Sequence, residues 1–555
     1  MKEWSTACID WEERLLNKQS IIMAPVLFPA VADHCMEIFK SLNIVDMIGR
    51  PTIGEVTRDW IFELAEVFFG SLDDINNVRY IDEYLLLISK KNTKSTIAAG
   101  IMLTILITNM RDSAEFLILA PTKEAADNAF APARDMIRAD DDLKELLMVQ
   151  EHIRTITYRS TGAKLKVVAA DGDTVSGSKA AGILIDELWA FGKRSRAGSM
   201  LTEATGGLAS RTEGFVIYLT TQSDEPPAGV FREKLAYARN VRDGVIVDPK
   251  FLPILYEFPK KLIDSKEYLN PENYWITNPN LGASVSKEFI ERKITSAQAD
   301  AGEESIQQVL AKFLNIEIGL NLRTDRWAGA DYWLEHVDKS LTLESLIERS
   351  EVIDVGIDGG GLDDMLGFCA MGREKDTGNW LTWVHAWVHP IALERRKSEA
   401  PRYRDFAAEG SLTIVKQIGD DVESIAVIVK TIDDAGLLDM IGVDPIGIGS
   451  VLDELEAIGI SKDKISGISQ GYKLGGAIKT AERELAKGKM VHSGTALMNW
   501  CVGNARIETR ANSILITKQA SGTGKIDPLM GVFNAVSLLS LNPNAMTEQY
   551  RLMVM

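Results

Sequence analysis

Cysteine is scarce in this sequence, and the spacing of the cysteines does not indicate a metal-binding or structural role. Four cysteines occur in 555 residues, and no two have the spacing of a zinc knuckle. This argues against a disulfide framework and favours a reducing, cytosolic setting. Histidine is also rare, with 6 residues, and no Ser-His-Asp or Cys-His arrangement indicates nucleophilic catalysis.

Long hydrophobic segments and a surplus of positive charge are missing as well. The longest apolar run, IAAGIMLTILI, is too short to span a bilayer and predicts a buried helix. The first residues, MKEWSTACIDWEERLL, carry acids and lack the apolar core of a signal peptide. The net charge of −18 argues against coating of nucleic acid over the whole surface. Local basic clusters can still contact it, because charges act over about 10 Å at ordinary salt.

The composition, 46% hydrophobic and 25% charged, is that of a globular chain long enough for two to four domains. Residues 1–75 have helical spacing and predict a helical segment packed on the next domain. Between 76 and 325, short apolar runs alternate with helical segments: YLLLIS, FLILAPT, KLKVVAAD, AGILIDE and FVIYLTT. Such runs predict a mostly parallel sheet covered by helices, with residues 226–325 peripheral to it.

A second α/β pattern follows a polar, helical linker at 326–349. Residues 350–555 begin with EVIDVGIDGGG, a predicted strand that ends in an acid. LGFCAMG and WLTWVHAWV predict an antiparallel meander, MIGVDPIG another strand ending in an acid, and KIDPLMGVFNAVSLL a closing helix. This order of elements predicts a ribonuclease H-like α/β domain.

The segment LLLISKKNTKSTIAAG has the outline of a phosphate-binding loop without its glycines. An apolar strand and a polar turn lead to Lys94 and Ser95 at the start of a helix, where lysine contacts phosphates and the hydroxyl contacts magnesium. Ile88 and Thr93 occupy the usual glycine positions. Because a β-branched residue resists positive φ, we expect the loop to bend differently or to bind nucleotide less tightly. The predicted nucleotide-binding residues are Lys90, Lys91, Asn92, Thr93, Lys94, Ser95 and Thr96.

Two further elements follow in the order that an ATPase requires. In AAGILIDELWAF a buried strand leads to Asp186, a predicted magnesium ligand, and Glu187, predicted to deprotonate the attacking water. In FVIYLTTQS a strand ends in polar side chains suited to sensing the γ-phosphate, namely Thr220, Thr221 and Gln222. Each feature alone could be a polar strand end, but together with the loop they predict a P-loop ATPase of the ASCE type that uses ATP and Mg²⁺.

Three acids predict a metal-dependent nuclease in the second domain. Asp358 and Asp444 end predicted strands, and Asp527 begins the closing helix. Convergent carboxylates select Mg²⁺ or Mn²⁺. Two such ions about 4 Å apart activate water and stabilise the leaving oxygen in phosphodiester cleavage.

Taken together, both halves resemble the large terminase subunit of tailed bacteriophages, over roughly residues 50 to 540. RYIDEYLLLISKKNTKST resembles that family's Walker A region, VSGSKAAGILIDELWAF its Walker B region and YLTTQS its coupling motif. WITNPNLG, FLNIEIGLNLRTDRW, GIDGGGLDDM, HSGTALMNWCVGN and KIDPLMGVFNAV resemble its linker and nuclease. The resemblance implies an ATP-driven motor that moves double-stranded DNA into a procapsid, and an endonuclease that cuts concatemeric DNA.

The resemblance also implies partners and further roles. A ring of about five subunits would dock on the portal protein and work with a small terminase subunit, in the host cell cytoplasm and without a membrane. A basic residue early in the loop acts on the γ-phosphate in this family, and Lys90 matches it most closely. Arg211 or Arg196 would be the arginine supplied to a neighbouring subunit. The family usually keeps the second glycine of the loop, so Thr93 is a departure from its pattern.

Several alternatives stay open at this point. An inactive loop would leave a nuclease or a DNA-binding assembly protein, and a helicase-like or transposition ATPase fused to a nuclease would carry similar motifs. Asp363 and Asp364 are either extra metal ligands or part of a turn after the glycines. His492 either faces the nuclease site or is a packing or surface histidine.

Overall fold

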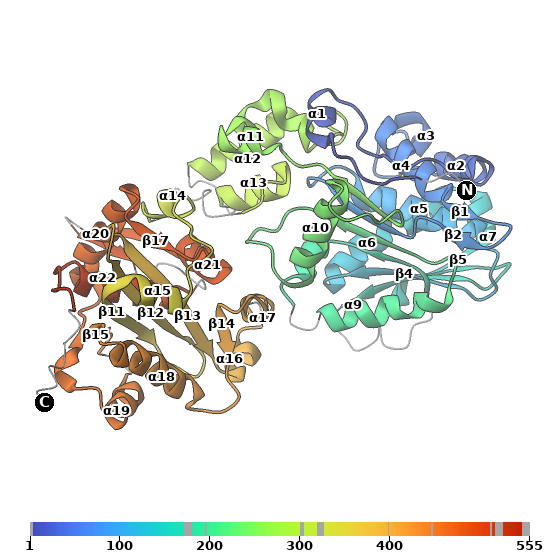
Figure 1. The fold of residues 1–555 in the computed structure, drawn as a ribbon. Helices are drawn as coiled ribbons and strands as arrows, with labels where there is room; N and C mark the ends of the chain where they lie inside the picture. The colour runs from blue at the N-terminus through green and yellow to red at the C-terminus, as the bar shows by residue number, and fades with distance from the viewer. Residues whose placement is uncertain are drawn as a thin grey trace, which may run out of the picture. The chain divides into compact units, whose positions relative to one another are not determined.

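The computed structural model describes residues 4–170, 180–194, 197–299, 305–318, 327–397, 399–445, 448–510, 513–516 and 525–546. The chain divides into two compact units, Met1–Ile318 and Gly319–Met555 (Figure 1). Within the ranges just given, every helix is too short or too polar to cross a membrane.

The first unit is built on an eight-stranded, mostly parallel sheet. Its order is β10–β3–β9–β8–β4–β7–β6–β5, and the strands from β10 to β7 are parallel while β6 and β5 join antiparallel at one edge. The strands are β3 (Glu83–Leu87), β4 (Glu115–Ala120), β5 (Leu147–Gln150), β6 (Thr155–Tyr158), β7 (Lys164–Ala169), β8 (Ala180–Ile185), β9 (Phe215–Thr220) and β10 (Phe251–Leu255). The five predicted strands and the mostly parallel sheet are therefore confirmed.

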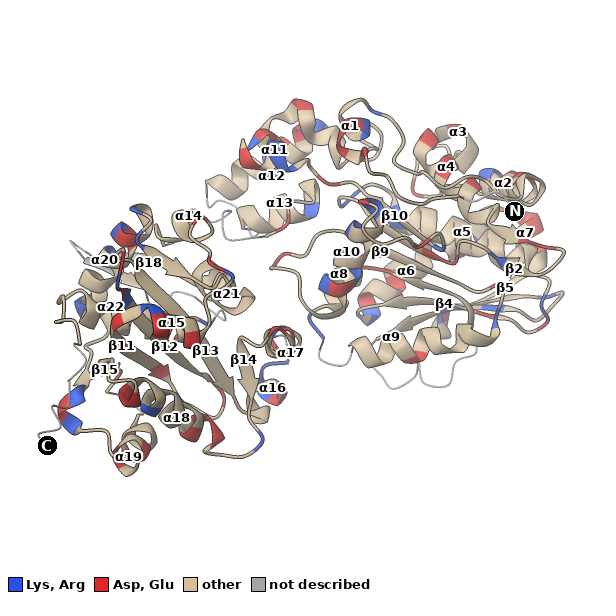
Figure 2. Cartoon of the chain, in the orientation of Figure 1, with Lys and Arg blue, Asp and Glu red and all other residues tan. Residues whose placement is uncertain are grey.

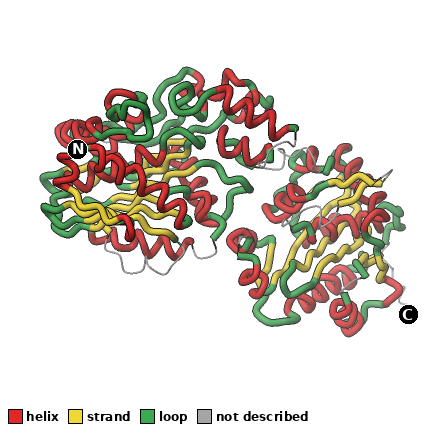
Figure 3. The backbone as a smooth tube through the Cα atoms, turned by 180° about the vertical axis from the view of Figure 1, so that it is seen from behind, coloured by secondary structure: helices red, strands yellow, loops and turns green. Residues whose placement is uncertain are grey.

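Helices cover both faces of this sheet because its strands present apolar side chains on alternate sides. Leu85 and Leu87 of β3 pack with α8 (Leu188–Phe191), α9 (Ala197–Gly206) and α10 (Gly229–Arg242). On the other face, Tyr84 and Leu86 line a small apolar cavity with side chains of α4 (Asp59–Phe69) and α5 (Lys94–Thr108). Figure 3 shows these strands between the two helical layers.

The remaining elements of the first unit surround this sandwich. The helices are α1 (Trp11–Leu16), α2 (Pro29–Ser41), α3 (Ile53–Val56), α6 (Lys123–Ala139), α7 (Asp141–Leu146), α11 (Lys260–Asp264), α12 (Lys287–Gln298) and α13 (Ile306–Leu314), and a small hairpin joins β1 (Leu72–Asp73) to β2 (Val78–Arg79). Helix α2 packs against both α4 and α5.

Strand β10 shows that residues 226–325, predicted to be peripheral to the sheet, contribute a strand to its edge. All five of its residues are buried, and it pairs in parallel with β3 at the edge of the sheet. Pro253 cannot donate a ladder hydrogen bond, so this segment fits an edge position but not a central one. The proline also interrupts the strand pattern, which is why the sequence did not indicate it.

The second unit contains a mixed sheet in the order β14–β13–β12–β11–β15–β16, with β17 paired to β13. The predicted meander is confirmed, because β11 (Ser350–Gly359), β12 (Met365–Glu374) and β13 (Trp380–Val388) pair antiparallel in sequence. Strand β15 (Leu438–Val443) pairs in parallel with β11, as the ribonuclease H-like order requires. The short strands are β14 (Leu412–Ile414), β16 (Ile465–Gly467), β17 (Met490–His492), β18 (Ile507–Arg510) and β19 (Ser513–Ile516).

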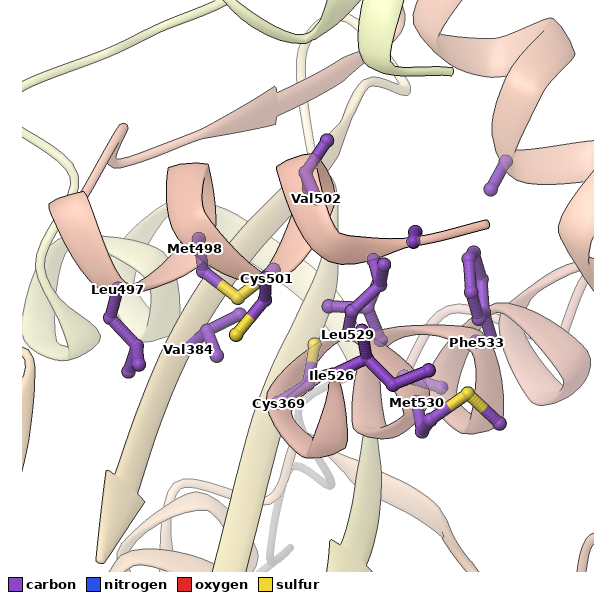
Figure 4. Packing of buried hydrophobic residues seen from close by; sticks show 14 of the residues in the cluster. Cys369, Val384, Leu497, Met498, Cys501, Val502, Ile526, Leu529, Met530 and Phe533 are labelled. Atoms are coloured by element: carbon purple, nitrogen blue, oxygen red, sulfur yellow. The ribbon is translucent and has the colours of Figure 1, made fainter. Parts of the chain in front are cut away.

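The predicted closing helix, α22 (Asp527–Leu539), packs directly on the backbone of β11. A Cβ atom added at Gly356 would lie 1.9 Å from the carbonyl oxygen of Gly531 and 2.6 Å from the amide nitrogen of Ala535. Only glycine therefore allows this close approach of helix and strand. Figure 4 shows Leu529, Met530 and Phe533 of α22 in the buried cluster that they share with α21 (Ala496–Asn504).

The opposite face of the second sheet is covered by a different set of helices. Ile353, Val355 and Ile357 of β11 pack with α18 (Asp420–Asp434) and α19 (Gly449–Ala457). Residues 327–349, which the sequence placed in a linker, also pack within this unit, because Trp327 and Trp333 are fully buried in its core. The other helices are α14 (Ala330–Trp333), α15 (Leu343–Arg349), α16 (Pro390–Arg395), α17 (Ala400–Glu409) and α20 (Gly475–Ala486).

Substitution Gly356→Ala tests the contact between α22 and β11. We expect it to lower the free energy of unfolding of the second unit by about 3 kcal/mol, because the added methyl group meets backbone atoms that cannot rotate away. Urea unfolding of the full chain measures this change. The control is Gly476→Ala in α20, where an added Cβ atom meets nothing within 4 Å and alanine stabilises a helix by about 0.5–1 kcal/mol. Equal effects of the two substitutions would contradict the packing argument.

Candidate nucleotide and metal sites

Polar residues from three neighbouring strands meet at one edge of the first sheet. Strand β9 lies between β3 and β8 and pairs in parallel with both, so the carboxyl ends of all three strands lie together. The loop 88–93 follows β3, Asp186 and Glu187 follow β8, and the polar end of β9 is Thr220, Thr221 and Gln222. The structure thus brings together the three elements that the sequence predicted for an ATPase.

Lys94 begins α5 and points back into the loop. Its side chain is buried, and its Nζ donates hydrogen bonds to the carbonyl oxygens of Ile88 at 3.2 Å and Ser89 at 3.4 Å. Burial lowers the pKa of this ammonium, while the negative charges of Glu187 and Asp186 raise it. Lys94 and the acids after β8 therefore interact electrostatically, as they must if both contact one triphosphate.

The two acids after β8 lie in different surroundings. Burial, and then the charge of Glu187, raise the pKa of Asp186 to about 7, although Lys94 opposes the shift. Glu187 has a left-handed backbone conformation, with φ 54°, and its carboxylate accepts a hydrogen bond from the indole N–H of Trp189. A buried carboxylate is costly without a cation. Asp186 therefore has the donor chemistry and the surroundings that suit a hard divalent ion such as Mg²⁺.

The polar end of β9 contains groups that lack partners within the described part of the chain. Gln222 is 1% exposed, and neither its side-chain oxygen nor its nitrogen has a hydrogen-bond partner there. The same holds for the buried hydroxyl of Ser89. Thr220, by contrast, accepts from the amide of Trp189 and donates to the carbonyl oxygen of Thr221. Since each unsatisfied buried group costs about 1–3 kcal/mol, a polar ligand at this edge would be favourable.

The loop before α5 has the left-handed backbone that glycine would normally supply. Lys91 has φ 73° and Thr93 has φ 60°, so the loop does not bend differently at Thr93, and weaker nucleotide binding stays a prediction. The buried Asn92 holds the loop in place: its Nδ2 donates to Oδ1 of Asn278 at 2.8 Å, and its Oδ1 accepts the amide of Asn280 at 3.0 Å. The sequence alone does not indicate either partner, although both lie in the segment WITNPNLG.

The other predicted nucleotide-site residues differ in exposure and position. Lys90 and Lys91 are exposed on the loop, and Ser95 and Thr96 are half-buried in the first turn of α5. Arg211 precedes β9, so it lies at the opposite end of the sheet from the loop of its own chain. Arg196 lies outside the described residues. A role for either arginine in a neighbouring subunit stays a prediction.

Strand register places two of the nuclease acids side by side. Strands β11 and β15 are parallel, with Ile357 opposite Val443. Asp358 and Asp444 follow these residues, so they lie at the same end and on the same face of the sheet.

The third acid reaches this end of the sheet from α22. A Cβ atom added at Gly367, the partner of Asp358 in β12, would lie 2.7 Å from the carbonyl carbon of Asp527. Asp358 is 2% exposed, Asp527 is fully buried, and Asp444 is half-buried. Among the residues described, no three acidic, histidine or cysteine side chains are already arranged to hold a metal ion. The backbone nevertheless gathers hard oxygen donors in a poorly solvated place, and their charges would favour a divalent cation.

Asp363 and Asp364 form the turn between β11 and β12. Asp364 accepts the amide of Met365 at 2.9 Å and forms an ion pair with Lys525 at 2.6 Å. Asp363 pairs with Arg395 at 3.7 Å. These contacts favour the interpretation of Asp363 and Asp364 as turn residues over their interpretation as extra metal ligands. Lys525, which sequence reasoning missed, brings a buried positive charge to within two residues of Asp527.

His492 packs in the interior and does not face the acids. It stacks on Trp333 with ring centroids 3.7 Å apart. Its Nε2 donates to the carbonyl oxygen of Trp333 at 2.7 Å, and its Nδ1 accepts the amide of Gly494 at 3.0 Å. Strand β17 pairs with the amino end of β13, whereas the acids lie at the carboxyl end of β11. Of the interpretations given above, that of a packing histidine is therefore the right one.

A pH dependence of stability follows from the burial of His492. Burial lowers its pKa from 6.5 to about 4, so the unfolded chain takes up this proton first as the pH falls. The contribution of the neutral His492 to the free energy of unfolding is complete above pH 6.5. It falls by at most about 3 kcal/mol as the pH drops to about 4. Thermal unfolding from pH 8 to 4 should show a weaker pH dependence for His492→Gln than for the parent chain. An unchanged profile would contradict the neutral, buried histidine.

Comparison with known proteins gives two family matches. Residues 64–240 match the family described as terminase large subunit, ATPase domain, and residues 254–541 match terminase large subunit, endonuclease domain. The terminase large subunit of Enterobacteria phage HK97 is 23% identical over 461 residues, which cover 82% of this chain and 86% of that protein. Protein YmfN of Escherichia coli strain K12 is 21% identical over 355 residues, covering 61% and 73%.

Solved structures of large terminases are also similar. The crystal structure of the HK97 bacteriophage large terminase aligns with TM-score 0.46 and 20% identity, covering 91% of this chain and 99% of that one. The large terminase of a thermophilic bacteriophage, in complex with ADP, aligns with TM-score 0.31 and 14% identity, covering 83% and 94%.

The family matches follow the order of the two sites along the chain. The ATPase match contains Lys94, Asp186 and Gln222, and the endonuclease match contains Asp358, Asp444 and Asp527. The endonuclease match alone spans more than half of the chain. This chain therefore belongs to the terminase large subunit family, with an ATPase domain that precedes an endonuclease domain.

Proposed function

We propose that this terminase large subunit couples ATP hydrolysis at the edge of the first sheet to movement of double-stranded DNA into a procapsid. The second unit would cut concatemeric DNA at the start and end of packaging. The observation that carries the proposal is the meeting of Lys94, Asp186 and Gln222 at one sheet edge, inside the region matched as the ATPase domain. The family match to both domains favours this function over a helicase-like or transposition ATPase.

In this proposal the loop and α5 bind the triphosphate. Lys94 would leave the loop carbonyls and contact the β- and γ-phosphates, while the amino end of α5 presents its free backbone N–H groups to them. The hydroxyl of Ser95 and the carboxylate of Asp186 would hold Mg²⁺. Lys90, with Lys91 beside it, would approach the γ-phosphate from the exposed side of the loop.

Hydrolysis would depend on the residues after β8 and β9. Glu187 would orient the attacking water and accept its proton, and the Trp189 indole N–H would hold the carboxylate in place. The buried Gln222, beside Thr220 and Thr221, would detect the γ-phosphate by forming the hydrogen bonds that it lacks in the described residues. Loss of the γ-phosphate would then change the end of β9 and the segment that follows it.

Cleavage would use the acids at the end of β11. When bound there, two Mg²⁺ or Mn²⁺ ions supply an activated water and charge stabilisation for the leaving oxygen. Asp358, Asp444 and Asp527 would hold the ions, since two of these acids are fixed by strand register and the third by α22. The Asp364–Lys525 ion pair would keep the turn next to them in place.

Partners are proposed from the family. The subunit would act in the host cell cytoplasm, in a ring of about five on the portal protein and with a small terminase subunit. Figure 2 shows lysine and arginine interspersed with acids on both units, so the net charge of −18 does not exclude local contacts to DNA. Phosphate contacts would make DNA binding strongly dependent on salt.

Substitution Glu187→Gln tests the assignment of the general base. It retains an acceptor for Trp189 but cannot take a proton, so we expect DNA-stimulated ATP turnover to fall at least about 100-fold. Nucleotide binding should change by less than about threefold. The control is Glu203→Gln on the exposed side of α9, which should leave both unchanged. Undiminished turnover would remove Glu187 from this role, and no turnover in the parent chain would favour an inactive loop.

Substitution Asp358→Asn or Asp527→Asn tests the nuclease site. Either change removes a charged ligand, so we expect Mn²⁺-dependent cleavage of plasmid DNA by the full chain to fall at least about 100-fold. ATP turnover, which belongs to the other unit, should be retained. The control is Asp453→Asn, an exposed acid on α19. Cleavage at the parent rate in both variants would exclude these residues from the site.

A further inference from the structure

Thr93 has a backbone conformation that its side chain disfavours. It immediately precedes α5, with φ 60° and ψ 21°, in the left-handed region. Glycine enters this region without penalty, whereas a β-branched residue there is a rare outlier that needs support from its surroundings. The support should be visible as contacts of the threonine side chain.

Those contacts come from Asn280, far along the chain. The Nδ2 of Asn280 donates to the hydroxyl of Thr93 at 2.9 Å, and that hydroxyl donates to the carbonyl oxygen of Asn92 at 2.8 Å. The Oδ1 of Asn280 accepts the indole N–H of Trp60, in α4, at 2.9 Å. Because an indole nitrogen only donates, this bond fixes which end of the Asn280 amide faces Thr93. Asn280 is 3% exposed, whereas its partners Thr93 and Trp60 are half-buried.

We propose that Asn280, oriented by Trp60, is a positioning residue that holds Thr93 in the left-handed conformation and so replaces the missing glycine of the phosphate loop. This rests on the proposed nucleotide function of the loop. In that conformation the backbone after Thr93 enters α5 directly, and Lys94 and Ser95 are placed at the amino end of the helix. Without the hydrogen bond from Asn280, Thr93 would relax toward negative φ, and the phosphate-binding groups would turn away.

Asn280 and Asn278 support the same loop through different hydrogen bonds. Asn278 holds Asn92 through a side-chain bond, and it donates to the carbonyl oxygen of Phe313 in α13 at 2.8 Å. Neither bond involves the hydroxyl of Thr93. Replacing Thr93 by glycine should therefore make the side chain of Asn280 dispensable, while that of Asn278 remains necessary.

The test is a double-mutant cycle measured as the affinity of the full chain for a non-hydrolysable ATP analogue with Mg²⁺. Asn280→Ala should weaken binding about tenfold, equal to about 1.4 kcal/mol. Thr93→Val keeps the shape of threonine but loses the hydroxyl, so it should weaken binding to a similar extent. Adding Asn280→Ala to Thr93→Gly should change affinity by less than about twofold relative to Thr93→Gly alone. Trp60→Phe should have a smaller effect of the same sign as Asn280→Ala.

Controls distinguish this inference from a general loss of structure and from failure of the proposed site. Asn278→Ala should weaken binding equally whether residue 93 is threonine or glycine, and thermal unfolding of every variant checks folding. Lys94→Ala should abolish binding in any background, and its failure to do so would refute the nucleotide site itself. Suppose that Lys94→Ala abolishes binding but Asn280→Ala has the same effect whether residue 93 is glycine or threonine. The proposed role of Asn280 is then refuted, while the nucleotide site is not.

Discussion

Parallel strand pairing determines where the candidate site residues of both units lie. Because neighbouring parallel strands end at the same edge of a sheet, strand pairing alone brings together the residues that follow β3, β8 and β9. The same pairing of β11 with β15 brings Asp358 beside Asp444. Chemistry in both units therefore depends first on backbone hydrogen bonds within the sheets, and only then on the side chains that project from the strand ends.

The phosphate loop depends on a second level of support, which comes from asparagine side chains. The side chain of Asn92 donates to that of Asn278 and accepts the backbone amide of Asn280, whose own side chain donates to Thr93. Asn278 also donates to the carbonyl oxygen of Phe313 in α13. Buried amides of this kind are stable only if their donors and acceptors are satisfied. The loop of this chain is thus shaped less by its own residues than by the segment that packs over it, which allows it to dispense with glycine.

Glycine is instead used in the second unit, where backbones must approach closely. Gly356 and Gly367 lie on β11 and β12 beneath α22, and a side chain at either would meet the backbone of that helix. This contact brings the amino end of α22, and with it Asp527, to the strand-end acids. The buried Lys525, two residues before Asp527, pairs with Asp364 in the turn between β11 and β12.

The sequence by itself determined the strands that end in acids or hydroxyls, the helix after Lys94 and the order of the two α/β patterns, because local apolar periodicity and residue type encode these features. The tertiary structure decided what depends on contacts between distant segments. It placed the proline-containing β10 at a sheet edge, buried His492 against Trp333, and put Arg211 at the end of the sheet away from the loop. It also supplied Asn280 to Thr93. No local pattern marks such pairs, since a hydrogen bond between residues far apart in the chain exists only after the intervening segments have packed.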